Sequence, residues 1–184
     1  MSEIAIASSN SFDSAKYVSE SASVTKEPVL FHILHIINIS KSRLSQRDDW
    51  LEYSDPNSAS VDRLNKSKKM VREVNIDDDG PIVSAFDVYK LLLQDSHKNV
   101  CYAFEKEPLR FLRDQRQSTG TPLPIRLGGK LLVKKDTPVW NGVLFLENRQ
   151  CTYLGVDAND PLNAQLNTGL VEKYIAILDQ ELKS

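Results

Sequence analysis

The stretch Val29-Leu-Phe-His-Ile-Leu-His-Ile-Ile-Asn-Ile39 carries the strongest strand signal in the chain, because it is rich in β-branched residues and has about the length of one strand. Simple alternation assigns four of its side chains to one face, namely Phe31, Ile33, Ile37 and Ile39. The opposite face is also substantially apolar, which is typical of a central strand. We therefore predict a central strand with those four side chains in the core.

Five further strand-like runs are predicted beyond residue 85. Phe86–Gln94 and Asn99–Glu105 flank a polar turn at residues 95–98, which indicates a β-hairpin. The remaining strands are Lys130–Lys134, Val139–Leu146 and Cys151–Leu154. Gly142, inside one of these strands, indicates a bulge or a sharp coil of the kind that barrels need. The connector at residues 106–123 is predicted to include a short helical turn at Leu109–Arg113.

The two ends of the chain have different compositions. Residues 1–27 carry eight serines without sustained periodicity, so we expect a flexible or weakly helical arm. Asp160-Pro161 indicates a helix start, and the helix is expected to run to about Leu182. Its apolar face consists of Leu162, Leu166, Leu170, Val171, Tyr174, Ile175, Leu178 and Leu182.

These elements predict an all-β fold with helical additions. The expected architecture is a five-stranded OB-fold barrel over residues 28–184, with a long insertion after the first strand and a C-terminal amphipathic helix at residues 160–182. A length of 184 residues suits one such domain with appendages.

Composition narrows the classes of function. The net charge of −2 does not indicate a strongly basic nucleic-acid binder, so any DNA contact should be local and sensitive to salt. Cys101 and Cys151 lie in strand-like runs and are expected to be buried free thiols in a reducing compartment. No apolar run approaches the ~20 residues that span a bilayer, and the N-terminus lacks a secretion signal.

The polar tract at residues 41–85 is too long for an ordinary connection in a small β-domain, where most loops run roughly 2–6 residues. Long insertions are usually functional or disordered, so this tract is the first place to look for function. Two short helices are predicted in it, at Leu44–Tyr53 and Arg63–Val74. It carries a basic block without acidic residues, which comprises Arg63, Lys66, Lys68, Lys69 and Arg72, and apolar anchors that include Trp50, Tyr53 and Leu64.

The basic block has two interpretations. Its cations could displace counterions from nucleic-acid phosphates, or they could form a solvated face of a loop helix. OB folds often bind single strands through aromatic side chains, and the candidates here are Tyr89, Tyr102, Phe104 and Trp140, some of which should point into the barrel.

No catalytic, metal or cofactor site is predicted. His32 and His35 are three residues apart on a strand and should project to opposite faces, so they cannot clamp a metal together. The acidic run at residues 75–80 resembles half a calcium loop, but Phe86 stands where the bidentate Glu is required. Gly129-Lys130 lacks the other residues of a phosphate-binding loop. The chain is therefore not expected to be an enzyme.

Three stretches, in this order, resemble the first OB domain of the RecQ-mediated genome instability protein family. The first runs from Phe31 through the strand to Gln46, and the second is Tyr89-Lys-Leu-Leu-Leu-Gln-Asp95. The third combines Gly128-Gly-Lys-Leu-Leu-Val-Lys134, Gly142-Val-Leu-Phe-Leu-Glu-Asn148 and Thr152-Tyr-Leu-Gly155. The resemblance covers roughly residues 29–182.

The resemblance implies a non-catalytic subunit of a nuclear complex that maintains genome stability. Its barrel would bind DNA topoisomerase III, and its insertion would regulate the opening and closing of that enzyme's gate. The processes are decatenation, homologous-recombination repair and double Holliday junction dissolution with a RecQ-family helicase. DNA would be contacted weakly or through the complex, and no membrane is involved.

The resemblance also suggests partner-binding residues. In the inserted loop they are Trp50, Tyr53, Arg63, Leu64, Lys66, Lys68, Lys69 and Arg72, and on the barrel Lys130 is the candidate. Two family features are not recognised in the sequence, namely a small helical domain before the barrel and a second OB domain after it, which suits the short fungal-type form. The alternative function is an autonomous single-stranded-DNA-binding OB module.

Overall fold

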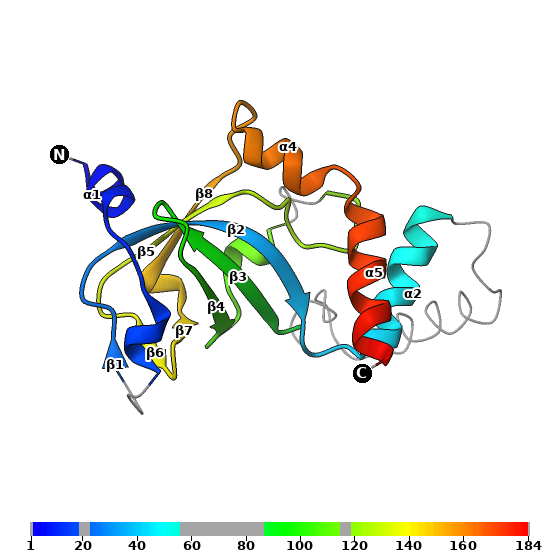
Figure 1. Ribbon diagram of the computed structural model, residues 1–184, viewed down its shortest axis with the longest axis horizontal. Coiled ribbons are helices and arrows are strands. Elements are labelled where there is room, and N and C mark those ends of the chain that lie inside the picture. The colour runs from blue at the N-terminus through cyan, green and yellow to red at the C-terminus, as the bar shows by residue number, and fades with distance from the viewer. Residues whose placement is uncertain (1, 19–22, 56–86, 115–118, 184) are drawn as a thin grey trace, which may run out of the picture.

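The computed structural model describes residues 2–18, 23–55, 87–114 and 119–183 (Figure 1). Its helices are α1 (Glu3–Ser9), α2 (Arg43–Ser54), α4 (Pro161–Asn167) and α5 (Leu170–Lys183), with 3-10 turns η1 (Ser14–Tyr17), η4 (Arg110–Leu112) and η6 (Asn148–Gln150). Its strands are β1 (Ser23–Val24), β2 (Val29–Asn38), β3 (Tyr89–Asp95), β4 (Val100–Glu105), β5 (Lys130–Val133), β6 (Pro138–Trp140), β7 (Val143–Leu146) and β8 (Cys151–Gly155).

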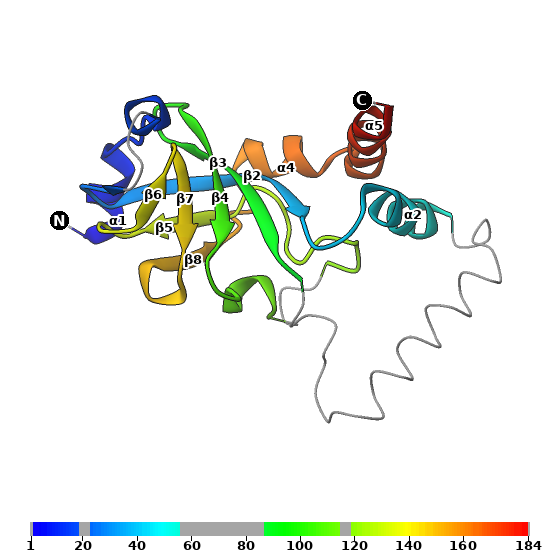
Figure 2. The same ribbon diagram turned by 90° about the horizontal axis from the view of Figure 1, so that it is seen from below.

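The strands form one curled sheet in the order β1-β6-β7-β4-β3-β2-β5-β8 (Figure 2). All pairs are antiparallel except β4 and β7, which run parallel. β5 and β6 lie near opposite ends of this order, yet only residues 134–137 separate them along the chain. The sheet must therefore curl on itself, and the predicted OB-type fold with helical additions is confirmed.

A β-bulge in the first predicted strand changes which side chains reach the core. Ile33 pairs with Leu93 but His35 pairs with Leu92, so Leu34 is an extra residue on β2. One inserted residue reverses the alternation that follows it. Ile36 is therefore buried. The core positions predicted for Ile37 and Ile39 are wrong, since Ile37 is only partly buried and Ile39 is 40% exposed.

The strand predicted over residues 139–146 is two strands joined by a tight turn. Asn141 and Gly142 both have positive φ, at 51° and 79°. Asn-Gly is the favoured pair for a two-residue hairpin turn, and β6 pairs with β7 through Val139↔Leu144 and Trp140↔Val143. The prediction of one continuous strand is therefore wrong, and Gly142, predicted as a bulge or a sharp coil, lies in the turn between two strands.

The C-terminal helix is also divided. The predicted start is confirmed, because the Asp160 carboxylate accepts a hydrogen bond from the Leu162 N–H at 3.0 Å and Pro161 is the first helical residue. Gly169 adopts φ 65° between α4 and α5, a left-handed conformation that ends a helix. The single helix to about Leu182 is thus two helices that meet at residues 168–169.

The N-terminal segment that we expected to be a flexible or weakly helical arm packs against the barrel over residues 2–18. Phe12 is buried in the core, and its N–H donates to the buried Asp95 carboxylate at 2.8 Å. Asp95 also accepts hydrogen bonds from the N–H groups of His97 and Asn99, both at 2.9 Å. One buried carboxylate thus closes the β3–β4 hairpin and holds the N-terminal segment on it.

Candidate partner-binding surface

The inserted tract leaves the barrel through α2, which confirms the first of the two predicted loop helices. Ser42 caps this helix by accepting a hydrogen bond from the Ser45 N–H at 3.1 Å. The Gln46 side chain donates to the carbonyls of Asn38 at 2.8 Å and Lys41 at 3.0 Å. These contacts join the first turns of α2 to the end of β2.

α2 packs along α5, as both views show (Figures 1 and 2). Trp50 is only 3% exposed and stacks on Tyr174 with ring centroids 4.6 Å apart. Tyr174 stacks in turn on His35 of β2 at 4.5 Å. Three aromatic rings from α2, α5 and β2 therefore form one stack, which fixes the two helices to the edge of the sheet.

Burial of this stack has an electrostatic consequence for its histidine. The pKa of His35 is lowered, chiefly because burial disfavours the imidazolium. Lys90 adds to this lowering through its positive charge, whereas the Glu181 carboxylate opposes it. The neutral imidazole is thus the form that suits this packing.

Two charged pairs flank the stack on the solvent side. Arg43 contacts Glu181 at 2.9 Å, and Arg47 contacts Asp179. All four side chains are substantially exposed, so each pair contributes about 0–1 kcal/mol. The aromatic stack, rather than these pairs, is the main attachment of α2.

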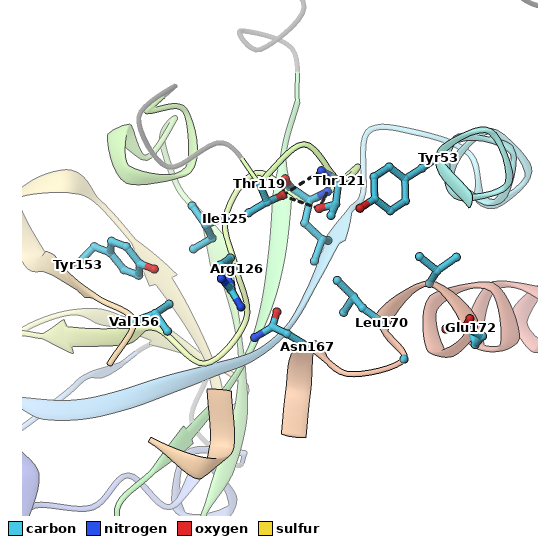
Figure 3. A pocket seen from close by; sticks show the side chains of 13 residues that line it. Tyr53, Thr119, Thr121, Ile125, Arg126, Tyr153, Val156, Asn167, Leu170 and Glu172 are labelled. Atoms are coloured by element: carbon cyan, nitrogen blue, oxygen red, sulfur yellow. Dashed lines mark hydrogen bonds between the residues drawn. The ribbon is translucent and has the colours of Figure 1, made fainter. Parts of the chain in front are cut away.

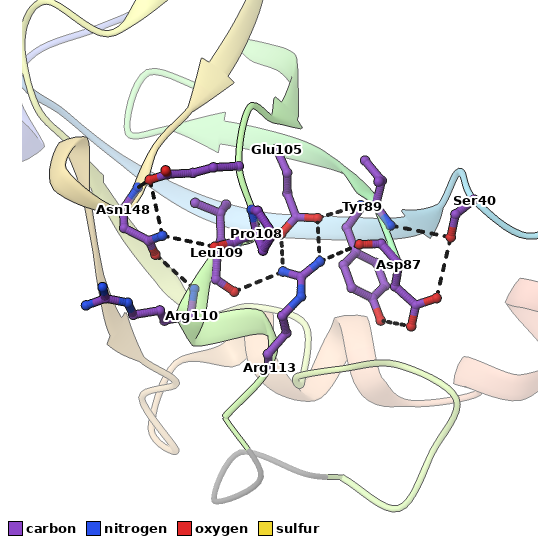
Figure 4. A network of polar contacts seen from close by, with 11 residues as sticks. Ser40, Asp87, Tyr89, Glu105, Pro108, Leu109, Arg110, Arg113 and Asn148 are labelled. Carbon is purple, nitrogen blue, oxygen red and sulfur yellow. Dashed lines mark hydrogen bonds and ion pairs between the residues drawn. The ribbon is translucent and has the colours of Figure 1, made fainter. Parts of the chain in front are cut away.

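The tract returns to the barrel at Asp87, where a polar network holds the chain (Figure 4). The Arg113 guanidinium donates to both Glu105 carboxylate oxygens and to the carbonyls of Asp87 and Leu109. Glu105 also accepts hydrogen bonds from the N–H groups of Tyr89 and Leu109, each at 2.9 Å. One buried ion pair therefore organises the start of β3, the end of β4 and the η4 turn.

The Arg113–Glu105 pair is well shielded from water. The Glu105 side chain is 3% exposed and that of Arg113 is 14% exposed. The pKa of Arg113 is raised, chiefly because its guanidinium donates to the Glu105 carboxylate. On the other side of Asp87, its carboxylate accepts a hydrogen bond from the Ser40 hydroxyl at 3.4 Å. Ser40 lies just beyond β2, so the outgoing and returning ends of the insertion are tied to each other.

A groove of about 750 Å³ opens beside these attachment points (Figure 3). It lies between the segment 119–126, the end of β8 and the α4–α5 junction, and Tyr53 of α2 borders it. Ile125 and Leu170 supply apolar surface, while Arg126 and Glu172 supply one charge of each sign. Such a lining, with apolar surface and one charge of each sign, suits contact with a polypeptide segment.

A family model described as "RMI1, N-terminal OB-fold domain" matches residues 6–167. The chain belongs to this family. RecQ-mediated genome instability protein 1 of Saccharomyces cerevisiae is 26% identical over 185 residues, an alignment that covers 87% of this chain and 70% of the relative. The resemblance drawn from the sequence is therefore confirmed at the level of the family.

The structure describes three of the predicted partner-binding residues of this RMI1-family chain. Tyr53 is 45% exposed at the groove. Trp50 lies beneath the surface, where it holds α2 on α5, so a direct partner contact by this side chain stays a prediction. Lys130 is half-buried on β5, opposite His32 of β2. The other six, Arg63, Leu64, Lys66, Lys68, Lys69 and Arg72, lie outside the described residues, as do the second loop helix and the half calcium loop.

The bulge in β2 also corrects the histidine geometry of the RMI1-family barrel. His32 and His35 pair with Gln94 and Leu92, which share one face of β3, so both histidines project to the same outer face. They serve different elements there. His32 lies 3.2 Å from the Asp160 carboxylate at the start of α4, while His35 stacks under α5.

The ion-pairing groups around α4 do not form a metal site. The pKa of Asp160 is lowered, chiefly by the hydrogen bond from the Leu162 N–H, with smaller contributions from His32 and Lys130. Within residues 2–18, 23–55, 87–114 and 119–183, no three His, Cys, Asp or Glu side chains are placed to hold a metal ion.

Over the same ranges no helix combines the length and apolar character needed to cross a bilayer.

The two cysteines are free and buried, as predicted. Burial is the main cause that raises the pKa of each thiol to about 12. Neither is therefore a ready nucleophile, because the thiolate is the reactive form.

Sequence reasoning missed the residues that anchor the insertion in this RMI1-family fold. Glu105 and Arg113 fall in or beside predicted elements, but nothing local marks them as a buried pair. Tyr174 falls on the predicted apolar face of a helix, but its contact with β2 joins residues that are 138 positions apart. A weak signal existed for Tyr174 alone, because a buried tyrosine hydroxyl usually finds a hydrogen-bond partner.

Proposed function

We propose that this chain is a non-catalytic subunit that binds DNA topoisomerase III and regulates the opening and closing of that enzyme's gate through its inserted tract. It would act in decatenation and in double Holliday junction dissolution, in the nucleus, together with a RecQ-family helicase. Membership of the RMI1 N-terminal OB-fold family supports a role in genome stability, and the yeast relative is named for RecQ-mediated genome instability.

The anchoring of the insertion at both ends is the observation that carries the gate role. The outgoing end is clamped by Trp50 against Tyr174, and the returning end is held by Arg113 and Glu105 around Asp87. The inserted tract can keep a fixed position relative to the barrel, and so act on a partner, only when its attachment to the barrel is rigid. Preorganised attachment also reduces the entropy lost when the complex forms.

The basic block supports a role in regulating the gate of topoisomerase III rather than in binding the enzyme alone. Arg63, Lys66, Lys68, Lys69 and Arg72 carry the charge needed near DNA phosphates, and the gate of a topoisomerase is the place where DNA passes. Tyr53 and the groove beside it provide the apolar contact on the barrel side.

Deletion of residues 56–86, with a short Gly-Ser linker in their place, tests the proposal. This variant keeps α2, whose removal would expose Tyr174 and confuse the result. We expect an intact barrel by circular dichroism, a retained but weaker complex with topoisomerase III by calorimetry, and impaired stimulation of decatenation. Normal stimulation by the deletion variant would exclude the gate role.

A second variant tests whether the basic block acts through its positive charge. Changing the five basic residues of the block to Gln retains the length of the tract but removes its positive charge. If the block faces DNA in the gate, decatenation should fall while the affinity for topoisomerase III changes little. Loss of the complex itself would assign the block to the protein interface.

A further inference from the structure

The outer side of β3, β4, β7 and β6 carries a row of apolar side chains that the proposed function does not use. In Figure 2 these four strands lie side by side, with α2 and α5 to their right. Cross-strand pairing identifies the inner side, because Leu91 pairs with Ala103 and Val139 pairs with Leu144, and all four are buried. The side chains between them therefore point outward. We call the outward side chains of these four strands the outer β face.

The outer β face is aromatic and open to solvent. Phe104 and Phe145 pair across β4 and β7 with ring centroids 6.0 Å apart, and Trp140 of β6 lies 6.5 Å from Phe145. Trp140 is 60% exposed, Val100 is 48% exposed and Tyr102 is 44% exposed. Large apolar side chains that stay exposed together in this way mark interaction sites.

One positive charge lies among these rings. The Lys90 ammonium is 4.0 Å from the ring centroid of Tyr102 and 5.7 Å from that of Phe104. Within the part of the chain that the structure describes, Lys90 forms no ion pair, and no outward position of the four strands holds a carboxylate. Apart from Lys90 and Gln94, the outward side chains are all apolar or aromatic.

This combination selects the chemistry of what could cover the face. A covering molecule removes the Lys90 ammonium from water, which is costly unless the molecule supplies an opposite charge. A second copy of this face would bring another lysine and no carboxylate. Nucleic acid fits less well, because Leu92, Val100 and Val143 offer bases no ring to stack on and one lysine cannot follow a phosphate backbone. An apolar protein segment that carries an acidic residue satisfies both requirements.

The dimensions of the face suit a helix. Four adjacent strands, about 4.8 Å apart, present a width of about 14 Å, which about ten residues of an α-helix span. A helix is also the usual second layer over an apolar sheet face. We propose that the outer β face binds an acidic amphipathic helix of a partner protein. Its apolar stripe would pack on Tyr102, Phe145 and Trp140, and a Glu or Asp beside that stripe would pair with Lys90.

Two matched peptides test the proposal on the full chain. Each has about 15 residues, with Leu and Phe in helical spacing, no Trp and a fluorescein label, and the polar positions are Glu in one peptide and Lys in the other. We expect the acidic peptide to bind more tightly by fluorescence anisotropy. The whole chain has a net charge of −2, so its overall charge would produce the opposite preference. The proposal does not depend on binding to topoisomerase III.

Trp140 reports directly whether the peptide lies on this face. The chain contains two tryptophans, of which Trp50 is buried and Trp140 is exposed. Bound acidic peptide, measured without its label, should shift Trp140 emission to shorter wavelength and protect it from acrylamide. Trp140→Phe should retain binding of the labelled peptide but lose the emission change.

Variants of the face then assign the two kinds of contact. Trp140→Ala should weaken the acidic peptide at least about fivefold. Lys90→Gln should weaken it at least about tenfold, and Lys90→Glu should reverse the preference toward the basic peptide. Leu154→Ala, an exposed apolar change on β8, should leave both affinities unchanged, and circular dichroism should show that each variant is folded.

Four outcomes would overturn the proposal. The first is absence of acidic-peptide binding, or equal binding of both peptides. The second is tighter binding of an oligothymidine that displaces the acidic peptide, which would make the face a nucleic-acid site. The third is a dimer in sedimentation analysis that Trp140→Ala dissociates, which would make a second copy the occupant. The fourth is loss of the topoisomerase III complex by Lys90→Glu, which would place the face in that interface.

Discussion

The Tyr174 hydroxyl makes two hydrogen bonds with the backbone of Ile36: it accepts one from the N–H at 3.0 Å and donates one to the carbonyl at 2.9 Å. β5 pairs with β2 only over Val29–His32, so the outer edge of β2 loses its neighbouring strand before Ile36. One side chain of α5 thus replaces a strand there, and burial raises the pKa of its hydroxyl. This contact joins the C-terminal helix to the strand that precedes the insertion.

Tyr174→Phe should therefore destabilise the fold without changing its shape. The substitution leaves a buried N–H and a buried carbonyl without their partner, which costs about 1–3 kcal/mol. Urea unfolding followed by circular dichroism measures the change. Tyr102→Phe removes an exposed hydroxyl and should change the free energy of unfolding by less than about 0.5 kcal/mol. Equal effects of the two substitutions would contradict the role of Tyr174.

Trp50 and Tyr53 should separate into a packing residue and a contact residue. Trp50→Ala opens a cavity between α2 and α5 and should lower the free energy of unfolding by about 3–5 kcal/mol. Tyr53→Ala should change it by less than about 0.5 kcal/mol but should weaken the complex with topoisomerase III. Thermal unfolding and calorimetry of the complex provide the two readouts. A stable Trp50→Ala variant would show that the stack does not hold α2.

The Arg113–Glu105 pair should behave as a unit. Arg113→Met leaves a buried carboxylate without its cation and should cost about 3–5 kcal/mol. Adding Glu105→Gln to that variant removes the unpaired charge, so the double variant should be less destabilised than the sum of the two single changes. Chemical unfolding of all three variants completes the cycle. Strict additivity would mean that the two side chains do not interact.

His35 should make stability depend on pH. Its pKa is lowered in the folded protein below the ordinary 6.5, so the unfolded chain binds more protons between these two values. Stability is then complete above about pH 6.5 and falls as the pH drops toward the folded pKa, below which this contribution stays constant. His35→Phe keeps the ring beside Tyr174 but cannot titrate. Unfolding free energies measured between about pH 5 and 7.5 should show a shallower slope for this variant, and identical slopes would exclude His35 as the source.

Substitution of Gly142, with Gly120 as a control, tests the hairpin turn between β6 and β7. Gly142 and Gly120 both adopt positive φ, at 79° and 73°. A Cβ on Gly142 would lie 2.9 Å from the carbonyl oxygen of Ser14, whereas Gly120 faces open space. Gly120→Ala should cost about 1–2 kcal/mol from backbone strain alone, and Gly142→Ala should cost more. The difference in melting temperature isolates the steric clash with the N-terminal segment, and no difference would contradict it.

Much of this protein follows from its sequence because the signals are local. The β3–β4 hairpin, the η4 turn, α2 and the start of α4 each follow from alternation, from breaks in it, or from a cap of a few residues. The Asn141-Gly142 pair is itself a local turn signal, and it marks the point where the predicted strand is divided. The order of these elements indicated the OB fold, whereas the family was indicated by the resemblance of three stretches of sequence to it.

Only the tertiary structure decided the remainder, because its causes join residues that are distant along the chain. The bulge at Leu34 allows Ile36 to enter the core and brings His35 beneath Tyr174. The buried pair of Arg113 and Glu105 depends on a turn and a strand end that meet only in the folded barrel. Local sequence determined which segments are strands and helices, whereas packing over long separations determined how the insertion is anchored and which aromatic rings stay exposed.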